Sequence, residues 1–190
     1  MTPENLFDLK GKVALVTGGA TGIGRMASIG LASAGAQVFI VSRKADACNA
    51  ISKEINQMDL TGSAEGFGGD IATLDGISNL IDTLKSRTGE LHILMNNAGR
   101  TWGSPMGAFP YDAWDKVMTL NVTGMFHLTQ GLVELLAASA EANNPARVVN
   151  VGSVMGEIPM GDGAYSYAAS KSAVHHMTRI LAKELIKRNI

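Results

Sequence analysis

Short apolar runs alternate along the chain with longer stretches in which apolar residues recur at helical spacing. The apolar runs cover 13–17, 37–42, 91–95 and 147–151, and a weaker run among the glycines of 62–69 ends at Asp70. The stretches with helical spacing are 23–34, 44–58, 73–88, 111–141 and 165–188. Strands that are apolar throughout are typically buried on both faces, and their alternation with helices is typical of a parallel sheet with crossover helices. The pattern predicts an α/β fold of the Rossmann type, with a doubly wound parallel sheet.

Length and composition narrow the class of protein. The chain has 190 residues, 46% of them hydrophobic and 17% charged, with a net charge of −1. This predicts a single domain, residues 1–190, and argues against a nucleic-acid or membrane partner. Cys48 is the single cysteine, and residues 1–12 lack the basic start and apolar run of a signal peptide. With no apolar stretch long enough for a membrane span, these features predict a cytoplasmic protein.

A glycine cluster directly follows the first predicted strand. Its residues are Thr17-Gly18-Gly19-Ala20-Thr21-Gly22-Ile23-Gly24, and a predicted helix begins within them. Glycine is needed where such a loop turns tightly or approaches a phosphate without a Cβ in the way. The free N–H groups of the helix start favour an anion at the same place. The loop predicts a dinucleotide site, and the alternative is a packing turn without a ligand.

The end of the second predicted strand indicates which dinucleotide binds. NAD sites place an acidic residue there to accept a hydrogen bond from the ribose 2′-hydroxyl. This chain has Ser42-Arg43-Lys44 instead. Arginine and lysine attract a 2′-phosphate that a carboxylate would repel, so we expect NADP(H) rather than NAD(H). The alternative is that both cations are solvated residues at a helix start, and Asp46 is interpreted as a first-turn charge of that helix.

Tyr167 and Lys171 are candidates for acid–base chemistry. They lie four residues apart on the last predicted helix, so their side chains share one face. A free tyrosine is a poor acid–base catalyst at neutral pH, and a lysine ammonium nearby favours the phenolate form. Tyr165 is the competing tyrosine, but it lies six residues from Lys171 and is expected to point away from it. By itself the pair is weak evidence, because such pairs also arise by chance on amphipathic helices.

Ser153 and Asn121 are further candidates. Ser153 follows the fifth predicted strand, and the carboxyl ends of parallel strands line the ligand crevice of such sheets. Its hydroxyl could hold a substrate carbonyl oxygen, or it could cap a turn. Asn121 lies within a long predicted helix, where asparagine is unfavourable. Its position favours a specific hydrogen-bonding role, although a capped break in the helix would also explain it.

Taken together, these motifs resemble those of the short-chain dehydrogenase/reductase family. In order along the chain they are Thr17-Gly-x-x-x-Gly-x-Gly24, Asn96-Asn-Ala-Gly99, Asn121, Ser153 and Tyr167-x-x-x-Lys171. The resemblance runs from about residue 8 to the last residue. It implies an NADP(H)-dependent oxidoreductase in which hydride passes from C4 of the nicotinamide to a carbonyl carbon.

The resemblance also implies a role for each candidate residue. Tyr167 would be the general acid toward the carbonyl oxygen, and Lys171 would bind the nicotinamide ribose and assist the tyrosine. Ser153 would orient and polarise the carbonyl, and Asn121 would anchor the water of a proton relay. The cofactor contacts implied by the resemblance and by the motifs above are Thr17, Gly18, Thr21, Gly22, Ile23, Gly24, Ser42, Arg43, Lys44, Asp70, Ile71, Asn97, Ala98, Gly99, Tyr167 and Lys171.

Within the family, segments 98–103 and 144–153 resemble the branch that contains the 3-oxoacyl-(acyl-carrier-protein) reductase of rhamnolipid synthesis. The branch implies reduction of a 3-oxoacyl thioester, borne on acyl carrier protein or CoA, to the 3-hydroxyacyl form. The alternatives are a reductase or dehydrogenase of another ketone or alcohol, and a dinucleotide-binding module with little turnover. NADP(H)-dependent members often carry a basic residue at the position of Thr21, so the expected cofactor depends on Arg43 and Lys44.

The resemblance further implies a homodimer or homotetramer in which 111–141 and 165–188 pair with their copies. A mixed stripe at helical spacing agrees with this, formed by Ala169, Ala173, His176, Ile180 and Glu184. No metal is expected, because the four histidines show no ligand spacing. Family members usually continue past the Tyr-Lys helix, so we expect the last strands to be missing and 147–151 to be a bare edge that lowers solubility.

Overall fold

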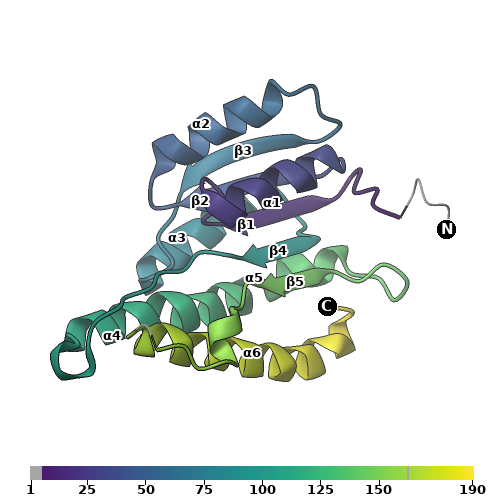
Figure 1. Ribbon diagram of the computed structural model, residues 1–190. Helices are drawn as coiled ribbons and strands as arrows, with labels where there is room; N and C mark the ends of the chain where they lie inside the picture. Colours follow the sequence, from purple (N-terminus) through teal and green to yellow (C-terminus); the bar gives the residue numbers. More distant parts are fainter. Residues whose placement is uncertain (1–5, 162) are drawn as a thin grey trace.

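The computed structural model describes residues 6–161 and 163–190. In this part of the chain, parallel strands form a five-stranded sheet in the order β3-β2-β1-β4-β5 (Figure 1). The strands are β1 (Val13–Thr17), β2 (Gln37–Ser42), β3 (Ser63–Gly68), β4 (Ile93–Asn96) and β5 (Arg147–Asn150). All residues of β1 are buried, as expected for a central strand covered on both faces. The predicted α/β class and parallel sheet are confirmed.

Helices lie on both faces of the sheet (Figure 1). They are α1 (Gly22–Ser33), α2 (Ala45–Asn56), α3 (Leu74–Lys85), α4 (Tyr111–Met118), α5 (Met125–Ser139) and α6 (Tyr165–Leu185). Side chains of α1 and α2 join Val16 in one buried cluster, and side chains of α3 and α5 join Leu15 in the other. Leu15 and Val16 fall in different clusters because successive side chains of a strand point to opposite faces. The sheet is therefore doubly wound, as predicted.

The predicted helix over 111–141 is interrupted. Between α4 and α5 lies a π-helical turn, η3 (Thr119–Gly124). The backbone approaches its neighbours closely there, since a Cβ on Gly124 would lie 2.0 Å from the carbonyl oxygen of Ile71. Helical periodicity of apolar residues continues through such a turn, and the sequence pattern alone therefore did not reveal it.

Other boundaries shift by a few residues. β3 ends at Gly68, two residues before the predicted Asp70, and α6 ends at Leu185, where a 3-10 turn continues over Ile186–Arg188. Asp46 lies in the first turn of α2, as interpreted from the sequence. These differences leave the order of strands and helices as predicted.

The strand order places a topological switch beside β1. From β1 the chain proceeds to β2 and β3 on one side, then crosses to β4 and β5 on the other. Thr17 is level with Val41 of β2, and Val16 is level with Met95 of β4, so the carboxyl ends of the central strands lie together. In open α/β sheets this is where ligands bind.

Within the described residues, no helix has both the length and the apolar character needed to cross a membrane. The same part of the chain contains no group of three or more His, Cys, Asp or Glu side chains arranged to hold a metal ion. Among these residues β5 pairs with β4 and has no second neighbouring strand.

Candidate active site

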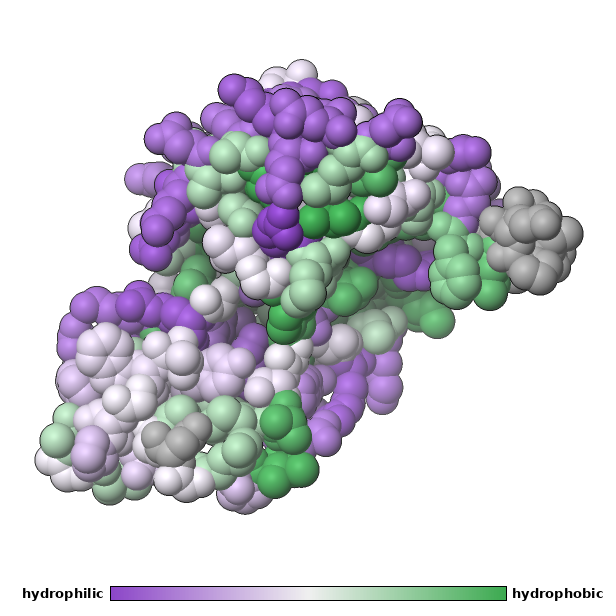
Figure 2. All heavy atoms as spheres, turned by 45° about the horizontal axis from the view of Figure 1, so that its top comes forward, coloured by the Kyte–Doolittle hydropathy of each residue, from purple (hydrophilic) through white to green (hydrophobic). Residues whose placement is uncertain are grey.

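A pocket of about 320 Å3 opens at the carboxyl ends of the strands. Figure 2 shows the molecule hollowed between the part with α1 and α2 and the part with α4 and α6. The pocket is lined by residues expected from the sequence to contact a cofactor, namely Thr17, Gly18, Thr21, Ser42, Arg43, Lys44, Asp70, Ile71, Asn97, Ala98 and Gly99. They come from β1, β2 and the segments after β3 and β4, which are distant in sequence. The structure thus brings these predicted residues together.

Five lining residues were not singled out from the sequence. They are Ala20, Val41, Ala47, Gly69 and Leu120. Four of them are direct chain neighbours of a candidate residue, and Ala47 lies one helical turn after Lys44. A search for residues next to strand ends, or one helical turn from a candidate, could therefore have identified these five. Their residue types alone do not indicate a binding role.

The glycine loop folds back tightly against the segment after β4. Gly18 and Gly22 have φ values of +63° and +52°, a region that side chains rarely adopt. A Cβ on Gly24 would lie 2.3 Å from the Gly18 carbonyl oxygen and 2.4 Å from Nδ2 of Asn97. The glycines are thus required by backbone conformation and close approach, as their spacing predicted.

The start of α1 has the form of an anion site. α1 begins at Gly22, and within the described residues the side chain of Thr21, its N-cap, forms no capping hydrogen bond. The first N–H groups of a helix have no intrahelical partner and carry a partial positive charge. Gly22, Ile23 and Gly24 form this first turn and do not themselves line the pocket.

Hydrogen bonds join the loops on either side of the switch. The Thr17 hydroxyl oxygen accepts from the N–H groups of Asn97 and Ala98, both at 3.0 Å. In return, Nδ2 of Asn97 donates to the carbonyl oxygens of Thr17 at 2.9 Å and Gly18 at 3.2 Å. The two loops form one unit, so a change in either displaces both walls of the pocket.

One end of the pocket is cationic. Arg43 and Lys44 are exposed and line it, directly after β2. The hydroxyl oxygen of Ser42 accepts from the Lys44 N–H at 3.2 Å and lies 3.1 Å from Sγ of Cys48, which fixes the turn. Asp70 also lines the pocket, but its carboxylate accepts from the N–H of Ala72 at 2.9 Å. The cations are thus held where an anionic ligand can reach them.

Asn121 is buried in η3, and all its amide hydrogen bonds go to other segments. Its Oδ1 accepts from the N–H of Arg100 at 2.9 Å, and its Nδ2 donates to the Arg100 carbonyl oxygen at 2.9 Å. Nδ2 also donates to the Ser170 hydroxyl at 2.9 Å, and Ser170 donates to the Tyr167 carbonyl oxygen at 2.7 Å. These bonds agree with the specific hydrogen-bonding role expected from the sequence, whereas no capped break occurs among the described residues, because the chain continues through η3 as a π-helical turn.

The candidate tyrosine and lysine face one another on α6. Nζ of Lys171 lies 5.6 Å from the centroid of the Tyr167 ring and donates to the Val151 carbonyl oxygen at 2.6 Å. Burial of Lys171 lowers the pKa of its ammonium group below the ordinary value. Tyr165 instead packs against Phe109, with ring centroids 5.8 Å apart, so it points away from Lys171 as predicted.

Ser153 lies in the segment that follows β5. Its hydroxyl oxygen accepts from the N–H of Met155 at 3.2 Å and caps the 3-10 turn η4 (Val154–Gly156). The capping interpretation is therefore confirmed. Asn121, Ser153, Tyr167 and Lys171 do not line the pocket itself, which extends on their side to Gly99 and Leu120, the neighbours of Arg100 and Asn121.

The model of one protein family matches most of this chain. It is that of short chain dehydrogenase, and it matches residues 12–190. The chain belongs to the short-chain dehydrogenase family. The oxidoreductase class expected from the motifs is thereby confirmed.

Named relatives agree with this assignment. The chain is 45% identical over 184 residues to the rhamnolipids biosynthesis 3-oxoacyl-(acyl-carrier-protein) reductase of Pseudomonas aeruginosa, covering 97% of this chain and 71% of the relative. It is 33% identical over 182 residues to a 3-oxoacyl-(acyl-carrier-protein) reductase of Thermotoga maritima, covering 96% of this chain and 71% of the relative. The resemblance to this branch of the short-chain dehydrogenase family is confirmed.

A solved structure has the same fold. It is the active-site complex of Pseudomonas aeruginosa RhlG with NADP, which superposes with a TM-score of 0.94 at 44% identity. The match covers 100% of this chain and 72% of that one. The Rossmann-type fold is therefore that of a known short-chain dehydrogenase structure.

Proposed function

We propose that this short-chain dehydrogenase is an NADP(H)-dependent reductase that converts a 3-oxoacyl thioester to the 3-hydroxyacyl form. The observation that carries the proposal is a pocket with a cationic end that extends to Gly99 and Leu120, beside the segments that Asn121 joins to α6 by hydrogen bonds. We propose that one domain, residues 1–190, holds both the cofactor site and the acid–base residues.

The chemistry of the pocket suits NADP(H). The first turn of α1, which begins at the positive-φ Gly22, leaves backbone N–H groups for a pyrophosphate, and Arg43 and Lys44 would meet a 2′-phosphate. Asp70, Ile71 and the segment 97–99 would hold the adenine and the middle of the cofactor. The solved relative that superposes on this chain contains NADP. When bound, NADPH supplies the hydride for the carbonyl carbon.

Residues of α6 and of the segment after β5 would handle the proton. The Tyr167 hydroxyl would donate its proton to the carbonyl oxygen as the carbon receives the hydride, which leaves the alcohol, NADP+ and a tyrosinate. In the cap of η4 the Ser153 hydroxyl oxygen only accepts a hydrogen bond. Its own proton therefore remains available for a hydrogen bond to the substrate carbonyl oxygen. Lys171, whose Nζ is 5.6 Å from the centroid of the Tyr167 ring, would stabilise the tyrosinate and contact the ribose.

Return of the proton from solvent is the role we propose for Asn121. It would anchor a water molecule that passes a proton toward Tyr167. The three hydrogen bonds of its amide hold η3 against segment 97–100 and α6, which gives such a water a fixed position.

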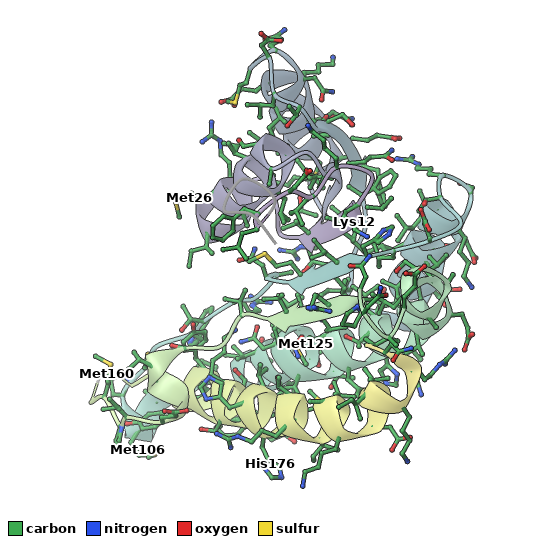
Figure 3. The ribbon with its side chains drawn as sticks, turned by 90° about the vertical axis from the view of Figure 1, so that its right-hand side faces the viewer. Lys12, Met26, Met106, Met125, Met160 and His176 are labelled. Carbon is green, nitrogen blue, oxygen red and sulfur yellow. The ribbon has the colours of Figure 1, made fainter. Side chains whose placement is uncertain are left out.

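Two observations support a 3-oxoacyl substrate over another ketone. The relative at 45% identity is a 3-oxoacyl-(acyl-carrier-protein) reductase, whereas the relatives at 33–36% identity include enzymes of gluconate and steroid substrates. In addition, Met106 and Met160 are exposed and lie near one another at one end of the molecule (Figure 3). The segments that carry them are joined where the Ser104 N–H donates to the Gly163 carbonyl oxygen at 3.2 Å. Flexible apolar side chains of this kind suit an acyl chain.

We further propose a cytoplasmic homodimer or homotetramer. α4 and α6 pack side by side, and Trp114, His176, Ile180 and Glu184 are exposed on them. These residues offer a mixed apolar and polar face to a second copy. The free and buried Cys48 is consistent with a reducing compartment.

The experiment follows the near-ultraviolet absorbance of NADPH with 3-oxoacyl thioesters, with simple ketones and with no substrate. We expect the largest kcat/KM with the thioesters. Faster turnover of simple ketones would mean that the substrate is a simple ketone and not a 3-oxoacyl thioester. NADPH binding without any turnover would reduce the protein to a dinucleotide-binding module.

A further inference from the structure

α6 holds the segment after β5 at three points of its backbone. Nζ of Lys171 donates to the carbonyl oxygen of Val151 at 2.6 Å, and the Ser172 hydroxyl donates to that of Gly156 at 2.5 Å. Between them, Nε2 of His175 accepts from the N–H of Ser153 at 3.3 Å. His175 lies one helical turn after Lys171 and two turns after Tyr167, so it extends the same face of the helix. Sequence reasoning assigned this histidine no part in the site.

The imidazole ring of His175 lies between two glycines of that segment. A Cβ on Gly152 would lie 2.3 Å from Nε2 of His175, and a Cβ on Gly156 would lie 2.9 Å from Cε1. The backbone therefore passes both edges of the ring at contact distance, and Ser153 lies between these two contacts. The ring determines where the segment runs.

The hydrogen bond specifies the form of the ring. Because Nε2 accepts from a main-chain N–H, it must carry a lone pair, and a neutral ring then holds its proton on Nδ1. Nδ1 is buried without a hydrogen-bond partner among the described residues, and Oε1 of Glu157 lies 3.5 Å away, beyond hydrogen-bond length but close enough for its carboxylate to attract an N–H group.

We propose that His175 is a positioning residue, which as the neutral ring protonated on Nδ1 fixes the main chain of Ser153 and thereby aims its hydroxyl at the substrate carbonyl. Through the cap, the Ser153 hydroxyl is bound to the same segment that the ring supports. This role rests on the proposed reductase function. With this role, α6 not only carries Tyr167 and Lys171 but also holds the main chain of Ser153 in place through His175.

Matched substitutions test the positioning role. His175→Gln places an amide oxygen at the reach of Nε2, and His175→Met has a similar length but only a weakly accepting thioether. We expect His175→Met to lower kcat by roughly ten-fold with little change in NADPH binding or KM, and His175→Gln to restore most of it. His92→Met is the control, because His92 also accepts a main-chain N–H, that of Val13 at 3.1 Å, but lies at the amino end of the sheet, away from the site. Equal losses in the Gln and Met variants would overturn the proposal.

A double-mutant cycle shows whether His175 acts through Ser153. In a Ser153→Ala background the hydroxyl to be aimed is gone, so we expect His175→Met to cost less than about two-fold in kcat. The full ten-fold loss in that background would mean that the histidine acts elsewhere, and the proposal would fail.

An activity-independent readout separates this proposal from the proposed function. Nitrogen-15 NMR of the histidine-labelled protein reports which ring nitrogen carries the proton. We expect the signal of the neutral ring protonated on Nδ1, also in Ser153→Ala, whose main-chain N–H remains. A ring protonated on Nε2 would refute the positioning role. If the signal is as expected but the protein has no reductase activity, the proposed function is refuted. The role of His175 in aiming the Ser153 hydroxyl at a substrate then fails as well, whereas the anchoring of the Ser153 main chain by His175 still holds.

Discussion

Replacement of Gly24 by alanine tests how tightly the glycine loop is packed. The added Cβ would lie 2.3 Å from the Gly18 carbonyl oxygen and 2.4 Å from Nδ2 of Asn97. Neither neighbour moves freely, because the Gly18 N–H donates to the Val41 carbonyl oxygen at 2.7 Å and the Asn97 amide bonds the main chain of both Thr17 and Gly18. The loop must therefore open to admit one methyl group.

The contacts set the size of the effect. Overpacking costs about 1–3 kcal/mol, and loss of the two hydrogen bonds of the Asn97 amide adds about 1 kcal/mol each. Alanine gains roughly 1 kcal/mol over glycine in a helix, which leaves a net loss of about 2–4 kcal/mol. For a chain of this size that lowers Tm by about 5–15 °C. NADPH binding should weaken roughly ten-fold or more, because the displaced loop lines the pocket.

Thermal unfolding and NADPH titration measure both effects, and Gly30 is the matched control. It lies in the same helix, but a Cβ there meets nothing within 4 Å. Gly30→Ala should stabilise the protein by about 0.5–1 kcal/mol and leave NADPH affinity unchanged. If Gly24→Ala melted like Gly30→Ala and bound NADPH as the wild type does, the packing argument would be refuted.

The remaining predictions concern the cofactor, the proton donor and a histidine at the amino end of the sheet. Arg43→Ala should weaken NADPH binding by about 1.5–3 kcal/mol and leave NADH binding unchanged, as measured by titration; equal weakening of both would contradict the 2′-phosphate contact. Tyr167→Phe should lower kcat by about 100-fold or more with normal NADPH binding, whereas Tyr165→Phe should keep most activity. The reverse result would mean that Tyr165 is the proton donor. Burial and the nearby Lys12 ammonium lower the pKa of His92, whose Nδ1 accepts a main-chain N–H at 3.1 Å. The unfolded chain binds that proton more readily, so the free energy of unfolding should fall as pH drops below about 6.5. His92→Asn should reduce this dependence in urea titrations at several pH values, and an unchanged acid-side slope would exclude His92 as its cause.

Much of the fold and of the cofactor site was predictable because it depends on local sequence. β1 and β2 have the predicted bounds, since a short run of apolar residues between polar ends has few alternatives to a buried strand. The glycine loop and the cations after β2 follow these strands directly. Once the strands are parallel, their carboxyl ends must meet, and residues distant in the sequence come to line one pocket.

Tertiary structure decided how the acid–base residues are held. The amide of Asn121 bonds Arg100 and Ser170, which are 21 and 49 residues away in the chain, and the break in the long helix occurs where these bonds form. His175 supports Ser153 from 22 residues away. Helical spacing shows which residues share a face of α6, but not which backbone packs against that face. Such contacts depend on how whole elements dock, because a hydrogen bond between distant segments leaves no periodic trace in the sequence.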